Sequence, residues 1–109
     1  MPAAGRAPAN RLTLDATIAQ RDDLRYTPAG LMALSLTLHH ESEQPEAGGR
    51  RRVDCEIAAV AFGETAAGLA RLPAGAALRC EGFLARRWRT GTTLALHIDR
   101  YTTRNDITD

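Results

Sequence analysis

Residues 64–72 read Glu-Thr-Ala-Ala-Gly-Leu-Ala-Arg-Leu, and no other stretch of this 109-residue chain has as good a helical pattern. Glu64 suits the positive end of a helix dipole, and Arg71 suits its negative end. Pro73 and Gly75 follow closely, and they are typical of the point where a helix stops. One short helix is therefore predicted, and the pattern on either side of it decides the fold.

Apolar and polar residues alternate on both sides of this helix, which is the pattern of strands with one buried face. Three such stretches precede the helix and two follow it, at residues 12–18, 32–38, 53–62, 78–84 and 94–98. Five strands with a helix between the third and the fourth is the order of the OB-fold, a partly open Greek-key barrel. SH3-like barrels are also small all-β domains, but the place of the helix favours the OB-fold. The sequence thus predicts an all-β, five-stranded OB-fold barrel with one short helix between strands 3 and 4.

The alternation also predicts which side chains face the inside of the barrel. They are Leu12, Leu14, Ile18, Leu34, Leu36, Val53, Cys55, Ile57, Leu78, Cys80, Leu94, Leu96 and Ile98. The two cysteines are therefore expected to be reduced core thiols rather than a disulfide. Gly82 falls within the fourth strand, and a glycine at such a place often allows a barrel strand to curve tightly.

The predicted domain covers residues 10–102, between short tails at residues 1–9 and 103–109. Residues 41–49 read Glu-Ser-Glu-Gln-Pro-Glu-Ala-Gly-Gly and contain no apolar anchor, so we expect a long mobile loop there. No apolar run approaches the ~20 residues that cross a membrane. The first ten residues lack the apolar segment of a signal peptide. A cytoplasmic protein without membrane partners is therefore expected.

Motifs of the common enzyme classes are missing from the sequence. It contains no nucleophile elbow, no phosphate-binding loop and no dinucleotide-binding glycine motif. The histidines and cysteines do not have the spacing of zinc ligands. The net charge is only +1, and all 14 basic residues are arginine, which a GC-rich genome would also produce in a chain with 20 alanines. We therefore expect a binding protein with no catalytic activity, no metal and no cofactor.

Two arginine clusters are predicted to lie on loops. In an OB-fold, nucleic acid binds in a groove that such loops border, where cationic side chains follow the phosphates and aromatic rings stack on bases. The same residues also fit a simpler interpretation, in which the arginines are solvated and the tryptophan covers the end of the barrel. Together the two clusters favour nucleic-acid binding. The predicted contact residues are Arg50, Arg51 and Arg52 in the first cluster and Arg86, Arg87, Trp88 and Arg89 in the second.

Four short stretches, in this order, resemble the bacterial single-stranded-DNA-binding proteins. They are Asn10–Leu12, Leu24–Gly30, Phe62–Glu64 and Gly82–Trp88. That family usually carries a long C-terminal extension with an acidic tip, whereas this chain stops a few residues after the predicted barrel. The resemblance, which covers roughly residues 10–101, is therefore to the short, single-barrel members of the family that work in the primosome.

The resemblance implies a homodimer that binds single-stranded DNA without sequence preference. It also implies an accessory role in replication restart, with the PriA helicase and other primosome proteins as partners. In one respect the sequence departs from the family, because Gly49 and Asp54 stand where aromatic residues are expected. Stacking would then depend on Trp88 and Tyr26, with Arg25 beside them. Two alternatives remain open: a protein–protein adaptor with weak or no DNA binding, and a general single-stranded-DNA-binding protein that lacks the tail.

Overall fold

The computed structural model of the chain describes residues 8–104, so residues 1–7 and 105–109 of the two predicted tails lie outside the described residues. The elements are β1 (Leu12–Arg21), β2 (Arg25–Tyr26), β3 (Met32–Glu46), β4 (Gly49–Phe62), α1 (Gly63–Leu69), β5 (Ala77–Arg86) and β6 (Leu94–Thr103). The predicted order of five strands and one helix is confirmed. The short strand β2 is an addition between the first two predicted strands.

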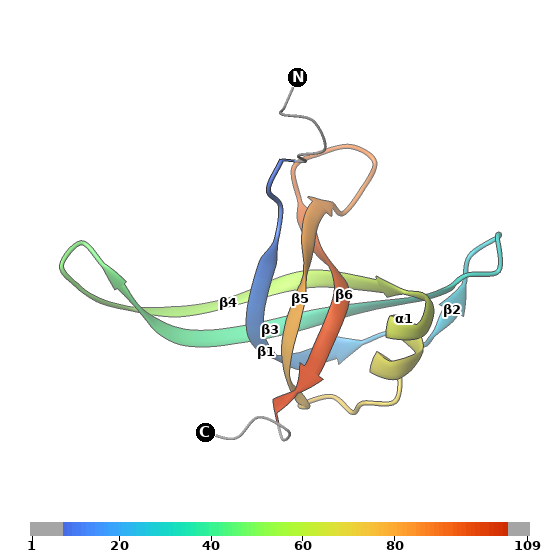
Figure 1. The fold of residues 1–109 in the computed structure, drawn as a ribbon, viewed down its shortest axis with the longest axis horizontal. Helices are drawn as coiled ribbons and strands as arrows, with labels where there is room; N and C mark the ends of the chain where they lie inside the picture. Colours follow the sequence, from blue (N-terminus) through green and yellow to red (C-terminus); the bar gives the residue numbers. More distant parts are fainter. Residues whose placement is uncertain (1–7, 105–109) are drawn as a thin grey trace.

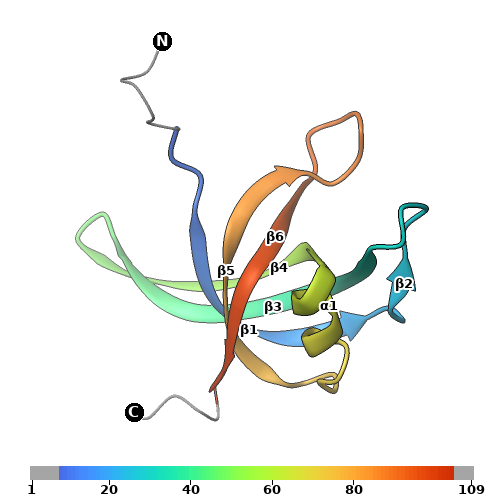
Figure 2. The same ribbon diagram turned by 45° about the vertical axis from the view of Figure 1, so that its right-hand side comes forward.

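The five long strands form one barrel (Figure 1). They lie in the order β1-β5-β6-β4-β3, and a further pairing of β1 with β3 closes the sheet. β4 and β6 run parallel, while the other paired strands are antiparallel. Helix α1 packs against β3, β4 and β6, as the turned view shows (Figure 2). The predicted OB-fold is therefore confirmed. None of the helices within residues 8–104 has the length and apolar character needed to span a membrane.

Large aliphatic side chains fill the inside of the barrel. Those that are fully buried are Ile18, Leu34, Leu38, Leu69, Leu78 and Leu96. Two predicted core positions are wrong, because Cys55 is exposed and Leu94 is 47% exposed. Cys55 precedes the part of β4 that pairs with β6, which begins at Ala58, and Leu94 is the first residue of β6, so neither faces a second layer. Four more predicted core residues are only half-buried: Leu12, Leu14, Val53 and Ile57.

The predicted mobile loop at residues 41–49 is wrong, because β3 and β4 continue through it as a two-stranded ribbon. Strand pairing extends to Glu46 opposite Gly49. The two turn residues, Ala47 and Gly48, have φ values of 52° and 79°. Positive φ at both central positions is the tight hairpin turn that matches the twist of paired strands. We call residues 41–54 the arm, and Figure 1 shows it projecting from the barrel.

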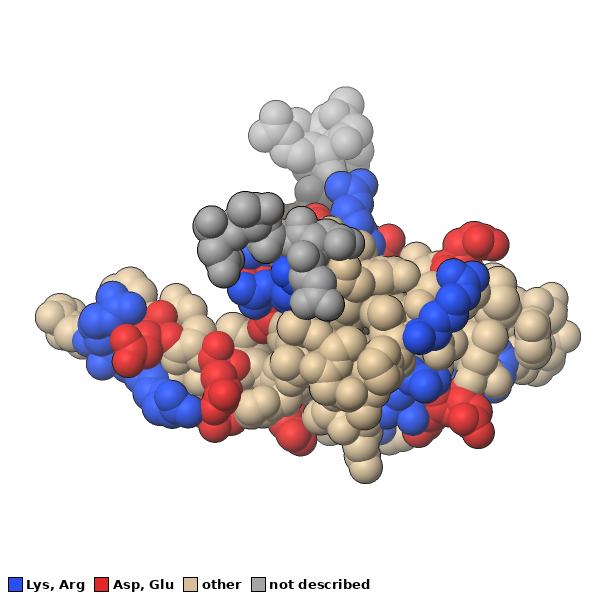
Figure 3. Space-filling model, turned by 90° about the horizontal axis from the view of Figure 1, so that it is seen from below, with Lys and Arg blue, Asp and Glu red and all other residues tan. Residues whose placement is uncertain are grey.

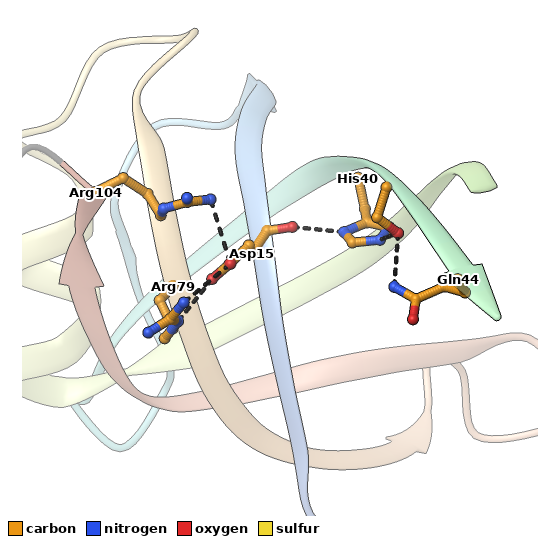
Figure 4. A network of polar contacts seen from close by, with 6 residues as sticks. Asp15, His40, Gln44, Arg79 and Arg104 are labelled. Carbon is orange, nitrogen blue, oxygen red and sulfur yellow. Dashed lines mark hydrogen bonds and ion pairs between the residues drawn. The ribbon is translucent and has the colours of Figure 1, made fainter. Parts of the chain in front are cut away.

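A polar network joins the base of the arm to the barrel (Figure 4). The Nδ1 atom of His40 lies 2.6 Å from the backbone oxygen of Asp15, and its Nε2 atom lies 2.7 Å from the hydroxyl of Ser42. Because a carbonyl can only accept, Nδ1 donates to it, and in the neutral ring Nε2 then accepts from Ser42. The carboxylate of Asp15 accepts two hydrogen bonds from Arg79 and pairs with Arg104. The hydrogen bonds from Arg79 hold the pKa of Asp15 below its usual value.

The curvature that Gly82 was expected to allow is present in β5. The pairing of β5 with β6 shifts register between Glu81 and Gly82, which marks a bulge. A β-carbon at Gly82 would overlap the carbonyl oxygen of His97 on β6. The two strands can approach this closely only because residue 82 has no side chain.

Candidate nucleic-acid interface

An open groove of about 440 Å³ lies on the outer side of β3, β4 and β6. Its floor includes Ser35 and Thr37 of β3, which alternate with the buried leucines of that strand. Ala58 and Val60 of β4 also line it. Alternation along a strand turns these side chains outward, and because they are small they leave room for a ligand above the sheet.

The groove brings together four of the predicted contact residues. Arg25 comes from β2, and Arg86, Arg87 and Trp88 come from the end of β5 and the loop that follows it. The indole of Trp88 is 59% exposed, and the guanidinium of Arg87 lies 4.6 Å from the centre of its ring. An indole this exposed does not cover the end of the barrel. It offers a flat apolar surface beside Arg87, in a groove that Arg25 and Arg86 also line.

The other predicted contact residues lie elsewhere. Tyr26 and Arg89 are exposed but do not line the groove. The three arginines of the first cluster lie on the arm, and each is within ion-pair distance of a glutamate. The pairs are Arg50–Glu43 at 3.1 Å, Arg51–Glu46 at 3.5 Å and Arg52–Glu41 at 2.7 Å. Figure 3 shows acidic and basic side chains intermixed along the projecting hairpin. The arm is therefore not a continuous positive surface.

Two aromatic residues of the groove were not predicted as contacts. Phe62 of β4 is 40% exposed, and its ring lies 6.2 Å from that of His97 on β6. Their outward strand phase was available from the sequence. Their proximity was not, because Phe62 and His97 lie 35 positions apart and meet only through the pairing of β4 with β6.

Strand pairing at the base of the arm also brings His39, Glu41 and Asp54 together, with their ligand-type atoms within 4.8 Å of one another. The spacing of histidines and cysteines had not suggested a metal site. The atoms already have protein partners: Nε2 of His39 lies 2.8 Å from Asp54, and Glu41 pairs with Arg52. The hydrogen bond with Asp54 raises the pKa of His39, and the same bond lowers the pKa of Asp54. We therefore interpret the three residues as part of a network of ion pairs rather than as a metal site.

Comparisons with known proteins identify the family of the chain. A family model described as "another single-strand binding protein family" matches residues 10–100. The replication restart protein PriB of Bordetella pertussis is 44% identical over 91 residues, which span 84% of this chain and 85% of that protein.

Two solved structures extend the comparison to three dimensions. The PriB protein of Ralstonia solanacearum is 36% identical, with a TM-score of 0.81 over 88% of this chain and 98% of that chain. The single-stranded DNA binding protein of Thermus aquaticus is 26% identical, with a TM-score of 0.70 over 87% of this chain and 50% of that chain. The match to PriB thus spans both chains, while the match to the Thermus protein spans half of that chain.

Proposed function

This chain belongs to the single-strand binding protein family and to its replication restart protein PriB group, and on that premise we propose that it binds single-stranded DNA during replication restart. One observation carries the proposal. Arg25 and the consecutive residues Arg86, Arg87 and Trp88 come from two separate parts of the sequence and line a single open groove on an OB-fold barrel. Cations next to an exposed aromatic ring are what a single strand requires, because its phosphates need charge and its bases need a stacking surface.

The groove supports binding without sequence preference. Stacking on Trp88 and Phe62 tolerates any base, since every base has a flat face. Arginine contacts to phosphates position the strand without reading its sequence. The proposal includes no catalytic step, metal or cofactor, and it places the action in the cytoplasm, where bacteria replicate their DNA.

We also propose that the chain forms a homodimer and assists the PriA helicase and other primosome proteins. The support for these partners is the similarity to PriB proteins over most of the chain. A physical motive exists for the dimer. Residues 12–16 of β1 pair with β5 on one side, whereas the pairing of β1 with β3 begins only at Thr17. An exposed strand edge of this kind readily pairs with another chain.

A protein–protein adaptor remains the second candidate, and the arm is the observation that favours it. Its three arginines are paired with glutamates, and Asp54 adds a further negative charge. Such a surface suits a mixed-charge protein partner better than a polyanion. DNA binding would then be weak and confined to the groove.

Binding to a labelled oligothymidylate of roughly 30 nucleotides, a length that spans several OB-fold sites, tests the proposal. We expect binding at low salt that weakens as salt increases, with the mass of a dimer in solution. Failure to bind at low salt would reject the DNA-binding function and leave the adaptor. A monomeric mass at micromolar concentration would reject the dimer.

A further inference from the structure

Three aromatic rings form a row on the outer face of β4, β6 and β5. The ring of His97 stacks on that of Phe83 with centres 4.9 Å apart and planes at 16°. On its other side the His97 ring faces that of Phe62, with ring centres 6.2 Å apart and planes at 31°. Phe83 and His97 are directly opposite in the pairing of β5 with β6. His97 is therefore held in place by a ring from each neighbouring strand.

The row is open to solvent although its members are aromatic. Phe62 and Phe83 are 40% and 39% exposed, and His97 is half-buried. Phe62 and His97 line the groove, while Phe83 continues the row beyond it. Aromatic rings that remain exposed side by side are more informative than single exposed apolar residues, because such a patch usually contacts a partner.

We propose that His97 is a DNA-contacting residue whose protonated form binds the strand more tightly, so that affinity for single-stranded DNA rises as the pH falls. This inference rests on the proposed function of the groove. The ring stacks within an aromatic row at all pH values. When it gains a proton, it adds a positive charge to the floor over which the phosphates pass. Histidine is the side chain that ordinarily changes its charge between about pH 5 and 8.

The charged groups around His97 explain why DNA would favour its protonated form. Arg25, Arg86, Arg87 and Asp22 line the same groove as His97. A bound strand would bring phosphates to these arginines, and the added negative charge would favour a positive charge on the groove floor. By reciprocity, if DNA favours the protonated ring, then the protonated ring favours DNA.

The neighbouring strands add few other charges to this face. On β6, Asp99 lies two residues beyond His97 and is engaged by Arg11 at 2.7 Å. On β5, Glu81 lies two residues before Phe83, and it is opposite Arg100 in the register of β5 with β6. From β4 the ring meets Phe62, which carries no charge. The change in charge on the groove floor is therefore expected to come from His97 itself.

The test measures binding of oligothymidylate, whose bases gain no proton in this range, at about pH 8 and about pH 5.5. We expect wild-type affinity to increase by up to about tenfold, which lies within the usual range for the coupling of two binding events. The slope of log affinity against log salt should also steepen by up to about 0.7. The variants His97→Gln and His97→Phe should lose both effects, and His97→Phe keeps the aromatic row.

The matched control is His39→Gln, since His39 lies at the base of the arm and outside the groove. This variant should keep the wild-type pH dependence. The inference fails if wild-type affinity is the same at both pH values. It also fails if the His97→Phe variant, shown to be folded by its thermal denaturation curve, has the same increase in affinity as the wild type. If the wild-type protein does not bind oligothymidylate at either pH, the proposed function itself fails, and the inference fails with it.

Discussion

The guanidinium of Arg52 lies 2.7 Å from the carboxylate of Glu41 on the adjacent strand of the arm. Arg50 and Arg51 are paired in the same way, whereas Arg86 and Arg87 line the groove. The two arginine clusters of the sequence therefore differ: a phosphate that binds an arginine of the arm has to displace a glutamate, whereas Arg86 and Arg87 line an open groove. This difference has consequences for binding that can be measured.

Salt dependence should separate the two clusters. Each phosphate contact that is lost should reduce the slope of log affinity against log salt by about 0.7 for a single strand. We expect this loss for Arg87→Ala, and little change for Arg51→Ala, because Glu46 already balances its charge. Equal losses for both variants would show that DNA also follows the arm.

Removing the glutamates of the arm should strengthen DNA binding. Exposed ion pairs are typically worth about 0.2–1 kcal/mol, so each holds its arginine only weakly. The triple variant Glu41→Gln, Glu43→Gln, Glu46→Gln leaves the three arginines unpaired. We expect tighter binding of oligothymidylate with a steeper salt slope. The variant Glu81→Gln, outside the arm, serves as the control, and unchanged affinity of the triple variant would contradict the prediction.

Trp88→Ala should weaken DNA binding without destabilising the protein. Loss of a stacking ring costs ~1–3 kcal/mol of binding, with little change in the salt slope. Because the side chain is 59% exposed, its removal should leave the melting temperature nearly unchanged. The variant should also lose any quenching of tryptophan fluorescence by DNA, since Trp88 is the only tryptophan of the chain. A lower melting temperature with unchanged affinity would assign Trp88 a structural role instead.

Gly82→Ala should destabilise the barrel, because the added carbon would overlap the carbonyl of His97. Overpacking of this kind typically costs about 1–3 kcal/mol of the free energy of unfolding. Gly49→Ala is the matched control, since its new carbon would meet only a backbone oxygen at 3.9 Å. Urea denaturation of both variants gives the comparison. Similar midpoints for the two would mean that β5 and β6 can separate at low cost.

The ion pair of His39 with Asp54 should stabilise the arm within a limited pH window. The pKa of His39 is raised, so its contribution is complete below 6.5 and is lost as pH rises through the higher folded value. The pKa of Asp54 is lowered, so its contribution is present above 3.8 and is lost as pH falls through the lower folded value. In an NMR titration, Asp54→Asn should shift the midpoint of His39 downward. An unchanged midpoint would show that the pair does not form in solution.

Alternation and helix signals are local, and for that reason the sequence by itself determined the order of the elements. The helical pattern at residues 64–72, where α1 occupies Gly63–Leu69, and the five strands around it sufficed for the OB-fold. Gly82 indicated where a strand must curve. Arg87, Trp88 and Arg89 were also placed correctly on a loop, whereas Arg86 of the same cluster ends β5.

Only the tertiary structure decided how distant residues meet. The arm was mistaken for a loop because its apolar content is low, yet its strands hold together through backbone pairing and through ion pairs that depend on register. The row of Phe62, His97 and Phe83 joins three strands that are separate in sequence. Alternation shows which way a side chain points, but its neighbours follow from which strands pair and in what register, and no local pattern contains that information.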